Sequence, residues 1–224
     1  MNTSKLKIFS FYKFIKISNP KEIKSLLDDF CKDRMLRGTI LLAYEGINAS
    51  ISGKERDLQD IIRKIYILLD IKKLNIRNTN VKFLPFNKMK VRIKKEIVSL
   101  GRNELNIPKY TGKFTAPEDW NKLLKKKNIK LIDTRNKYEF NIGHFKDAIN
   151  PKTKSFRDFP KKIEELGIKK DDEIVMYCTG GIRCEKMSAF LRTEGYSSVT
   201  QLEGGILNFL DYFKNSKKNH SWIG

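Results

Sequence analysis

The stretch EIVMYCTGGIRCEKMSAFL, residues 173–191, decides the fold of the second half of the chain. An apolar run leads into Cys178, a glycine-containing loop follows, and a helical pattern begins near Cys184. A buried strand followed by such a loop and a helix is typical of a parallel sheet, in which ligand sites lie at the carboxyl ends of the strands. The sequence therefore predicts a site at Cys178.

Cys178 stands where loop amides and the positive end of a helix dipole favour an anion on sulfur. Arg183 adds a fixed positive charge, and two glycines allow the backbone N–H groups to turn inward. These features lower a thiol pKa from about 8.5 into the range of about 3.5–7.5. We expect Cys178 to be the catalytic nucleophile, held by an active-site loop of Thr179, Gly180, Gly181, Ile182 and Arg183.

Helical and strand-like segments alternate on both sides of this loop. The expected helices cover 117–126, 156–166, 184–195 and 206–213, and the expected strands cover 129–135, 173–178 and 197–205. Helices that alternate with short apolar strands indicate a parallel sheet covered on both faces. The second half is therefore predicted to be an α/β domain.

The first hundred residues show a different pattern, in the order β-α-β-β-α-β. Strands are expected over 6–17, 38–44, 47–52, 81–86 and 88–100, with helices over 20–31 and 52–69. Ser52 and Glu55 have the spacing of a capping box at the start of the second helix. The order predicts an N-terminal ferredoxin-like, or acylphosphatase-like, α+β sandwich with one free sheet face.

Changes in composition divide the chain into four segments. We expect a basic ferredoxin-like domain over 1–100, a Gly- and Pro-punctuated linker over 101–116, an α/β domain over 117–216 and a tail over 217–224. A chain of 224 residues accommodates two domains that each bury a core without disulfides.

Positive charge is concentrated in the first half. The chain has 46 Lys and Arg against 26 Asp and Glu, and residues 1–110 hold 24 of the former and 11 of the latter. Such a surplus favours a nucleic-acid partner. Lys88, Lys90, Arg92 and Lys94 alternate along a strand and would place four cations on one face, where an RNA backbone could lie. The alternatives are an edge strand protected by lysine and a general lysine enrichment of the chain.

Three cysteines form no even disulfide framework, and the N-terminus lacks the apolar core of a signal peptide. We expect a cytoplasmic protein with reduced thiols, no membrane span and no evident protein partner. Cys31 falls on an apolar helix face and is predicted to be core, whereas Cys184 could resolve an oxidised Cys178 or simply pack. No nucleotide-binding or metal-binding motif is present, so no metal or cofactor is evident.

The loop spacing C-x-x-G-x-R and the upstream stretch LIDTRNKYEFNIGHFKDAIN, residues 131–150, resemble the signatures of the rhodanese superfamily. Four residues separate Cys178 from Arg183, one fewer than in the Cys-x5-Arg phosphatase loop. The smaller loop suits a persulfide sulfur or a small oxygen species better than a phosphate. The resemblance implies a rhodanese-like fold and disfavours a phosphatase. It also implies mostly structural roles for Asp133, Arg135 and His144.

A closer resemblance covers nearly the whole chain. GTILLAYEGINASISG (38–53), FRDFP (156–160) and MYCTGGIRCEK (176–186) are similar to segments of the rhodanese-domain tRNA uridine hydroxylase family. This resemblance implies oxygen-dependent 5-hydroxylation of the wobble uridine, position 34, with tRNA as partner and molecular oxygen as co-substrate. It also implies that the loop cysteine is required. Because no metal or flavin motif is evident, we expect an oxidised Cys178, persulfide or sulfenate-like, as the working species.

Two other classes of function stay open on the sequence. One is a rhodanese-type sulfurtransferase that carries a persulfide on Cys178, and the other is an RNA-binding module without catalysis. Relatives usually continue past a Trp-x-Gly like 222–224 into a cysteine-rich tail, and the given sequence stops at Gly224. If that tail helps to hold RNA or a metal, reduced activity is expected without it. The segment Glu45–Asn48 is expected either to form only a hairpin turn or to contact RNA or the other domain.

Overall fold

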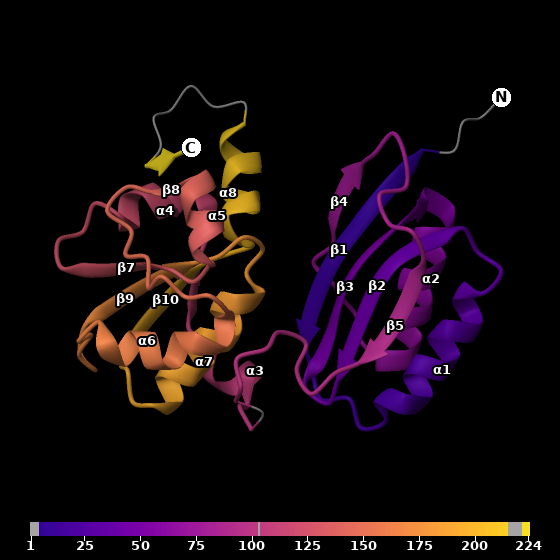
Figure 1. The fold of residues 1–224 in the computed structure, drawn as a ribbon, viewed down its shortest axis with the longest axis horizontal. Helices are drawn as coiled ribbons and strands as arrows, with labels where there is room; N and C mark the ends of the chain where they lie inside the picture. The colour runs from indigo at the N-terminus through magenta and orange to yellow at the C-terminus, as the bar shows by residue number, and fades with distance from the viewer. Residues whose placement is uncertain (1–4, 103, 215–220) are drawn as a thin grey trace. The chain divides into compact units, whose positions relative to one another are not determined.

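The computed structural model describes residues 5–102, 104–214 and 221–224 (Figure 1). The chain divides into two compact units, Met1–Ile97 and Val98–Gly224. In the described part of the chain, no helix combines the length and apolarity needed to cross a bilayer. Each unit has its own core and is described by itself.

The first unit is an α+β sandwich, as predicted. Its five-stranded sheet has the order β4-β1-β3-β2-β5, in which neighbours are antiparallel except the parallel pair β2 and β5. The elements are β1 (Leu6–Phe14), α1 (Pro20–Cys31), β2 (Leu36–Ala43), β3 (Gly46–Lys54), α2 (Glu55–Leu69), β4 (Arg77–Asn80) and β5 (Met89–Ile93).

Helices α1 and α2 cover one face of this sheet. Leu27 of α1 and Ile61 of α2 are fully buried in one cluster with Ile40 of β2 and Ile51 of β3. The pleat sends alternate residues to the opposite, helix-free face. There Ser10 pairs with Ser50, which pairs with Thr39 and then Lys90 in one cross-strand row, and the two serine hydroxyls lie 2.9 Å apart. The helix-free face is therefore polar at its centre and basic at the β5 edge.

Three local predictions in this unit are wrong. Pairing with β1 ends near Val81, whose N–H donates to the Leu6 carbonyl, and residues 81–86 are not a strand. Pro85 has no N–H for a ladder, which disfavours a strand there. Strand β5 ends at Ile93 rather than near residue 100. The second helix begins after Lys54 with no side-chain cap, because the Ser52 hydroxyl donates to the Arg37 carbonyl instead.

The second unit is built on a four-stranded sheet, β6-β10-β9-β7, whose pairs are all parallel. This confirms the predicted α/β architecture. The elements are α3 (Ile107–Tyr110), β6 (Lys113–Thr115), α4 (Pro117–Leu123), β7 (Ile129–Asp133), α5 (Lys137–Ile142), β8 (His144–Phe145), η1 (Phe156–Asp158), α6 (Phe159–Glu165), β9 (Glu173–Tyr177), α7 (Ile182–Thr193), β10 (Ser198–Leu202), α8 (Gly205–Phe213) and β11 (Trp222–Ile223).

Helices cover both faces of the parallel sheet (Figure 1). On one face, Phe159 and Met187 bring α6 and α7 against Met176 of β9. On the other face, Trp120 and Phe209 bring α4 and α8 against strands β7 and β9. Because both faces are covered, the central strands are apolar along their length, which is why the sequence shows them as continuous apolar runs.

The segment expected to be a linker, residues 101–116, instead contributes secondary structure to the second unit. It holds α3 and the edge strand β6, which pairs with β10. The Gly112 N–H donates to the buried Ser188 hydroxyl at 2.9 Å, so contacts too distant in sequence to predict fix this segment. Of the expected tail, residues 217–220 lie outside the described residues. Trp222–Ile223 forms β11 against β8.

Candidate active site around Cys178

Cys178 lies between β9, which ends at Tyr177, and α7, which begins at Ile182. The start of α8 fixes this loop by its main chain. The N–H groups of Ile206 and Leu207 donate to the carbonyls of Cys178 and Thr179 at 2.9 and 3.1 Å. These bonds satisfy two of the amides that a helix N-terminus leaves without an internal partner.

The approach of α8 depends on a glycine. Gly205 has φ +65°, and a Cβ added there would lie 2.5 Å from the Cys178 carbonyl oxygen. Gly181, which precedes α7, also has positive φ, at +98°. Gly180 is exposed, and an added Cβ would meet no atom within 4 Å. Gly205 and Gly181 therefore shape the loop, whereas Gly180 leaves open space beside it.

The sulfur of Cys178 is surrounded by hydrogen-bond donors. The Gly181 N–H donates to it at 3.0 Å. Burial raises the pKa of Cys178, but a hydrogen bond from the Cys184 thiol, the charge of Arg183 and the amides of Cys184 and Gly181 together lower it to about 6. These contacts favour the thiolate form of Cys178. This is the electrostatic setting that the loop sequence predicts for Cys178.

The thiol is fully buried, which differs from the partly exposed setting of most reactive cysteines. The Gly181 and Cys184 amides face the sulfur, and α8 binds the carbonyls of the adjacent residues Cys178 and Thr179. A substrate atom can therefore reach the sulfur only when the loop opens.

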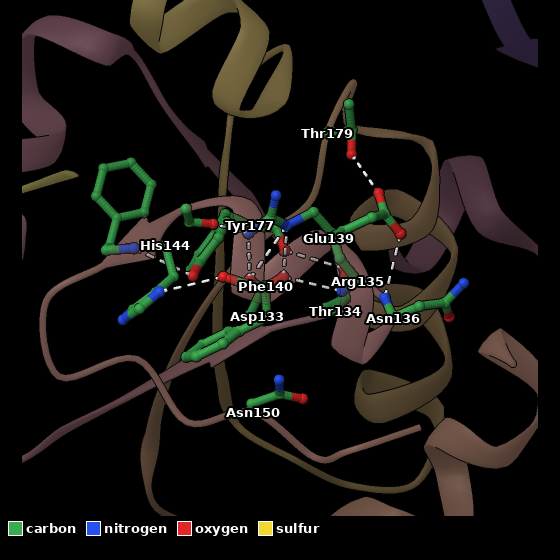
Figure 2. Close-up of polar contacts among 12 residues, drawn as sticks. Asp133, Thr134, Arg135, Asn136, Glu139, Phe140, His144, Asn150, Tyr177 and Thr179 are labelled. Atoms are coloured by element: carbon green, nitrogen blue, oxygen red, sulfur yellow. Dashed lines mark hydrogen bonds and ion pairs between the residues drawn. The ribbon is translucent and has the colours of Figure 1, made fainter. Parts of the chain in front are cut away.

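Arg183 does not stand free in the loop. Its guanidinium donates two bonds of 2.7 Å to the Glu139 carboxylate. The same carboxylate accepts from the Thr179 hydroxyl at 2.8 Å (Figure 2). Burial raises the pKa of Glu139, but the hydrogen bonds and charge of Arg183 and the bond from Thr179 lower it to about 2. The charge of Arg183 is thus balanced inside the site, which does not form a cationic cradle for a phosphate.

Glu139 is a site residue that the sequence analysis did not single out. It lies on α5, a short helix that begins at the carboxyl edge of β7 and was not predicted. The Asn136 N–H donates back to the Glu139 carboxylate at 3.2 Å, as in a capping box. The Asn-x-x-Glu spacing of residues 136–139 is the signal that could have revealed both the helix and its carboxylate.

Asp133, Arg135 and His144 brace the site from outside the loop, as their expected structural roles require. The Arg135 guanidinium donates to Asp133 and, at 2.6 Å, to the Gly143 carbonyl. The ring of His144 stacks on Phe140 with centroids 3.9 Å apart. Phe140 lies in α5 and Gly143 ends it, so these contacts fix the helix that carries Glu139. Figure 2 shows Asp133, Arg135 and His144 together with Glu139.

Cys184 lies in the first turn of α7 and is fully buried. Its sulfur is 3.4 Å from the Thr134 hydroxyl, in addition to its bond with Cys178. Burial and the neighbouring Cys178 raise the pKa of Cys184 well above its usual value. Cys31 is buried in the core of the first unit, and burial raises its pKa to about 11, as expected for a packing cysteine.

The four cations predicted to bind RNA lie on or beside β5 of the first unit. Lys90 and Arg92 are strand residues, and Lys88 and Lys94 flank them. Val91 between Lys90 and Arg92 is buried in the core, so these two cations share the helix-free face. Lys88, Arg92 and Lys94 are exposed, and Lys90 is half-buried.

The Glu45–Asn48 segment holds the end of the first unit. The Glu45 carboxylate accepts the Ile97 N–H at 2.7 Å, and the Asn48 amide donates to the Ile97 carbonyl at 3.0 Å. Both side chains therefore bind main chain at residue 97. Among residues 5–102, 104–214 and 221–224, no group of three or more His, Cys, Asp or Glu side chains is arranged to hold a metal.

Comparisons with known proteins agree with this architecture. Residues 6–97 match the UPF0176 acylphosphatase-like domain, and residues 116–212 match the rhodanese-like domain. A tRNA uridine(34) hydroxylase of Pelagibacter ubique is 46% identical over 219 residues, which cover 97% of this chain and 71% of that protein. The chain belongs to the tRNA uridine(34) hydroxylase family. The family resemblance seen in the sequence is thereby confirmed.

Two further hydroxylases of the family match over the same span. One from Wolbachia pipientis is 43% identical, and the match covers 97% of this chain and 78% of that protein. One from Rickettsia prowazekii is 39% identical, with coverage of 98% and 89%. Both units of the chain, including the Cys178 loop, therefore lie inside the matched region.

Proposed function

We propose that this chain hydroxylates C5 of uridine 34 in tRNA, with Cys178 as its reactive group and molecular oxygen as co-substrate. The observation that carries the proposal is the stabilised Cys178 thiolate, whose pKa is lowered to about 6, in a chain matched almost throughout by hydroxylases of this name. A tRNA substrate places the enzyme in the cytoplasm.

The helix-free face of the first unit supports binding of the RNA backbone. Lys88, Lys90, Arg92 and Lys94 lie along one sheet edge and provide charge without a buried pocket. Phosphate contacts of this kind position an RNA and carry little sequence information. Selection of the target base therefore belongs to the Cys178 loop, and a base of a single-stranded loop can leave its stack at low cost.

The Cys178 loop supports an oxidised sulfur as the working species. Its amides and the Cys184 thiol favour electron-rich atoms at the sulfur, and the balanced charge of Arg183 leaves no cationic cradle for a larger anion. In the proposed transfer, Cys178 is first converted to a sulfenic acid by molecular oxygen and an external two-electron donor, with the second oxygen atom leaving as water. The sulfenic Cys178 then gives its oxygen to C5. The C5 hydrogen leaves as a proton, and the sulfur keeps the electron pair and returns as a thiolate.

Nucleoside mass spectrometry of tRNA tests the proposal. A strain without its own hydroxylase is complemented with the parent chain, Cys178→Ala or Cys31→Ala. We expect 5-hydroxyuridine with the parent and with Cys31→Ala, whose thiol packs in the other unit. Loss of Cys178 should remove the product to background. Full complementation by Cys178→Ala would show that product formation does not depend on Cys178 and would overturn its reactive role.

Sulfur transfer is the second candidate, because residues 116–212 match a rhodanese-like domain and a thiolate in a small loop suits a persulfide. The same tRNA measurement separates the two reactions by mass. Hydroxylation adds one oxygen to the uridine, whereas sulfur transfer to the base replaces an oxygen by a sulfur. A sulfur-containing product that depends on Cys178 would replace the first proposal by the second.

A further inference from the structure

Cys184 is a buried thiol beside the reactive sulfur, and the oxygen-transfer step proposed above does not consume it. It belongs to the same core cluster as Cys178, and hydrogen bonds from its thiol and its amide lower the pKa of the Cys178 sulfur. The third neighbour is the hydroxyl of Thr134, at 3.4 Å from the Cys184 sulfur.

The donor in the contact between Thr134 and Cys184 follows from the other hydrogen bond that Thr134 makes. The Thr134 hydroxyl donates to the Tyr177 carbonyl at 3.0 Å, and a carbonyl has no hydrogen to give in return. The single hydrogen of Thr134 is therefore already used. In the contact between Thr134 and Cys184, the shared hydrogen must come from the thiol. Cys184 thus has one hydrogen and two acceptors, the Thr134 oxygen and the Cys178 sulfur.

The charge on Cys178 decides between the two acceptors. A hydrogen bond to an anion is about twice as strong as one between neutral groups. When Cys178 is a thiolate, the hydrogen of Cys184 therefore points at it. When that sulfur is protonated or carries a covalent bond, Thr134 becomes the better acceptor. Because burial raises the pKa of Cys184 far above the neutral range, its hydrogen stays available throughout.

We propose that Cys184 is a positioning residue whose S–H hydrogen moves between Thr134 and Cys178 and stabilises the sulfur anion of the active site. The proposal rests on the reactive role of Cys178 given above. It differs from a resolving role, in which Cys184 and a sulfenic Cys178 would condense to a disulfide and water. The positioning role needs a hydrogen-bond donor at residue 184, and the resolving role needs a sulfur there.

Serine and alanine at residue 184 separate the two roles. Serine keeps a donor and cannot form a disulfide, and alanine removes both functions. The measurement is the pH at which alkylation of Cys178 by iodoacetamide reaches half its maximal rate, followed by peptide mass spectrometry on the full chain. We expect Cys184→Ser to keep the parent midpoint near pH 6 and Cys184→Ala to raise it by about one to two pH units.

The matched control is Cys31→Ala and Cys31→Ser, the same substitutions at a buried thiol of the other unit. These variants should leave the Cys178 midpoint unchanged. Equal midpoints in Cys184→Ser and Cys184→Ala would overturn the proposal, as would a Cys178–Cys184 disulfide accumulating during turnover of the parent.

Thr134→Val provides a second route if Cys184→Ala does not fold. Valine removes the competing acceptor, so the Cys184 hydrogen is left to Cys178 alone, and the midpoint should fall. A midpoint that is unchanged or higher in Thr134→Val would contradict the proposal. Alkylation uses no tRNA and no turnover. A failed hydroxylation assay and a failed Cys184 experiment are therefore distinguishable.

Discussion

The two regions that the proposals assign to RNA and to chemistry handle charge in opposite ways. On the helix-free face of the first unit, Lys88, Arg92 and Lys94 are exposed to solvent. In the Cys178 loop, the sulfur is fully buried and Arg183 is bound to Glu139 by two bonds of 2.7 Å. The helix-free face therefore presents several cations to solvent, whereas in the Cys178 loop each charge is paired with a neighbouring group.

The difference predicts how each region responds to substitution. Exposed charges act at long range and are screened by salt, so removing one has a modest and nearly additive effect. Buried hydrogen-bonded charges act over a few ångströms, and removing one partner leaves another without compensation. Substitutions at the loop should therefore have large effects on stability that depend on the residue changed. Substitutions at the β5 edge should each have a small effect on RNA affinity, and these effects should add.

The largest effect on stability is expected for Gly205→Ala. Its φ of +65° disfavours a side chain, and the new Cβ would lie 2.5 Å from the Cys178 carbonyl oxygen. We expect a loss of about 2–4 kcal/mol in the free energy of unfolding, measured by urea denaturation. Gly180→Ala is the matched control, because nothing lies within 4 Å of its Cβ. Equal losses in both variants would show that α8 does not hold the loop.

A smaller effect with a defined pH dependence is expected for Glu139→Gln. The pKa of Glu139 is lowered from 4.5 to about 2 in the folded chain. As the pH falls, the unfolded chain therefore takes up this proton at a higher pH than the folded chain does. Its contribution to stability is complete above about pH 4.5 and is lost as the pH falls toward 2. The variant should be less stable than the parent by about 1–3 kcal/mol at pH 7.

Thermal denaturation of parent and Glu139→Gln at pH 7 and pH 3 checks this prediction. The difference in midpoint temperature should shrink at the lower pH, because the parent then begins to lose the same contribution. A difference that stays constant between the two pH values would mean that the Glu139 charge does not hold the loop.

The smallest effect per residue is expected at the β5 edge. Lys90→Ala with Arg92→Ala should weaken tRNA binding and reduce the slope of log affinity against log salt by about one for each phosphate that the variant no longer neutralises. Lys21→Ala with Arg56→Ala is the control, because these exposed cations lie on α1 and α2, which cover the other face. Electrophoretic mobility shifts at several salt concentrations give the slope. Identical slopes in both double variants would remove the β5 edge from the RNA surface.

The sequence predicted the parts of the structure that local chemistry determines. Asn19 and Pro20 mark the start of α1, and the Asn19 side chain accepts the Glu22 N–H. The loop at Cys178 is equally local, because its donors are amides within six residues and a neighbouring thiol. The residues that determine the start of α1 and the Cys178 loop therefore lie close together in the sequence.

The parts that were missed depend on distant contacts. Strand β6 is only three residues long and is an edge strand paired with β10, and Gly112 before it binds Ser188. Glu139 belongs to the site only because the parallel pairing of β7 with β9 brings Asp133 beside Tyr177 and so brings α5 beside the loop. Arg183 lies 44 residues after Glu139 in the sequence, so no local pattern links the two side chains. Its role was therefore invisible without the sheet.

The attachment of the Cys178 and Thr179 carbonyls to α8 has a consequence for selectivity. Both carbonyl oxygens are occupied by α8 before any substrate arrives, so neither is free to bind a hard cation at the loop. The group that the main chain offers to the sulfur is instead a donor, the Gly181 N–H, which suits an electron-rich atom there.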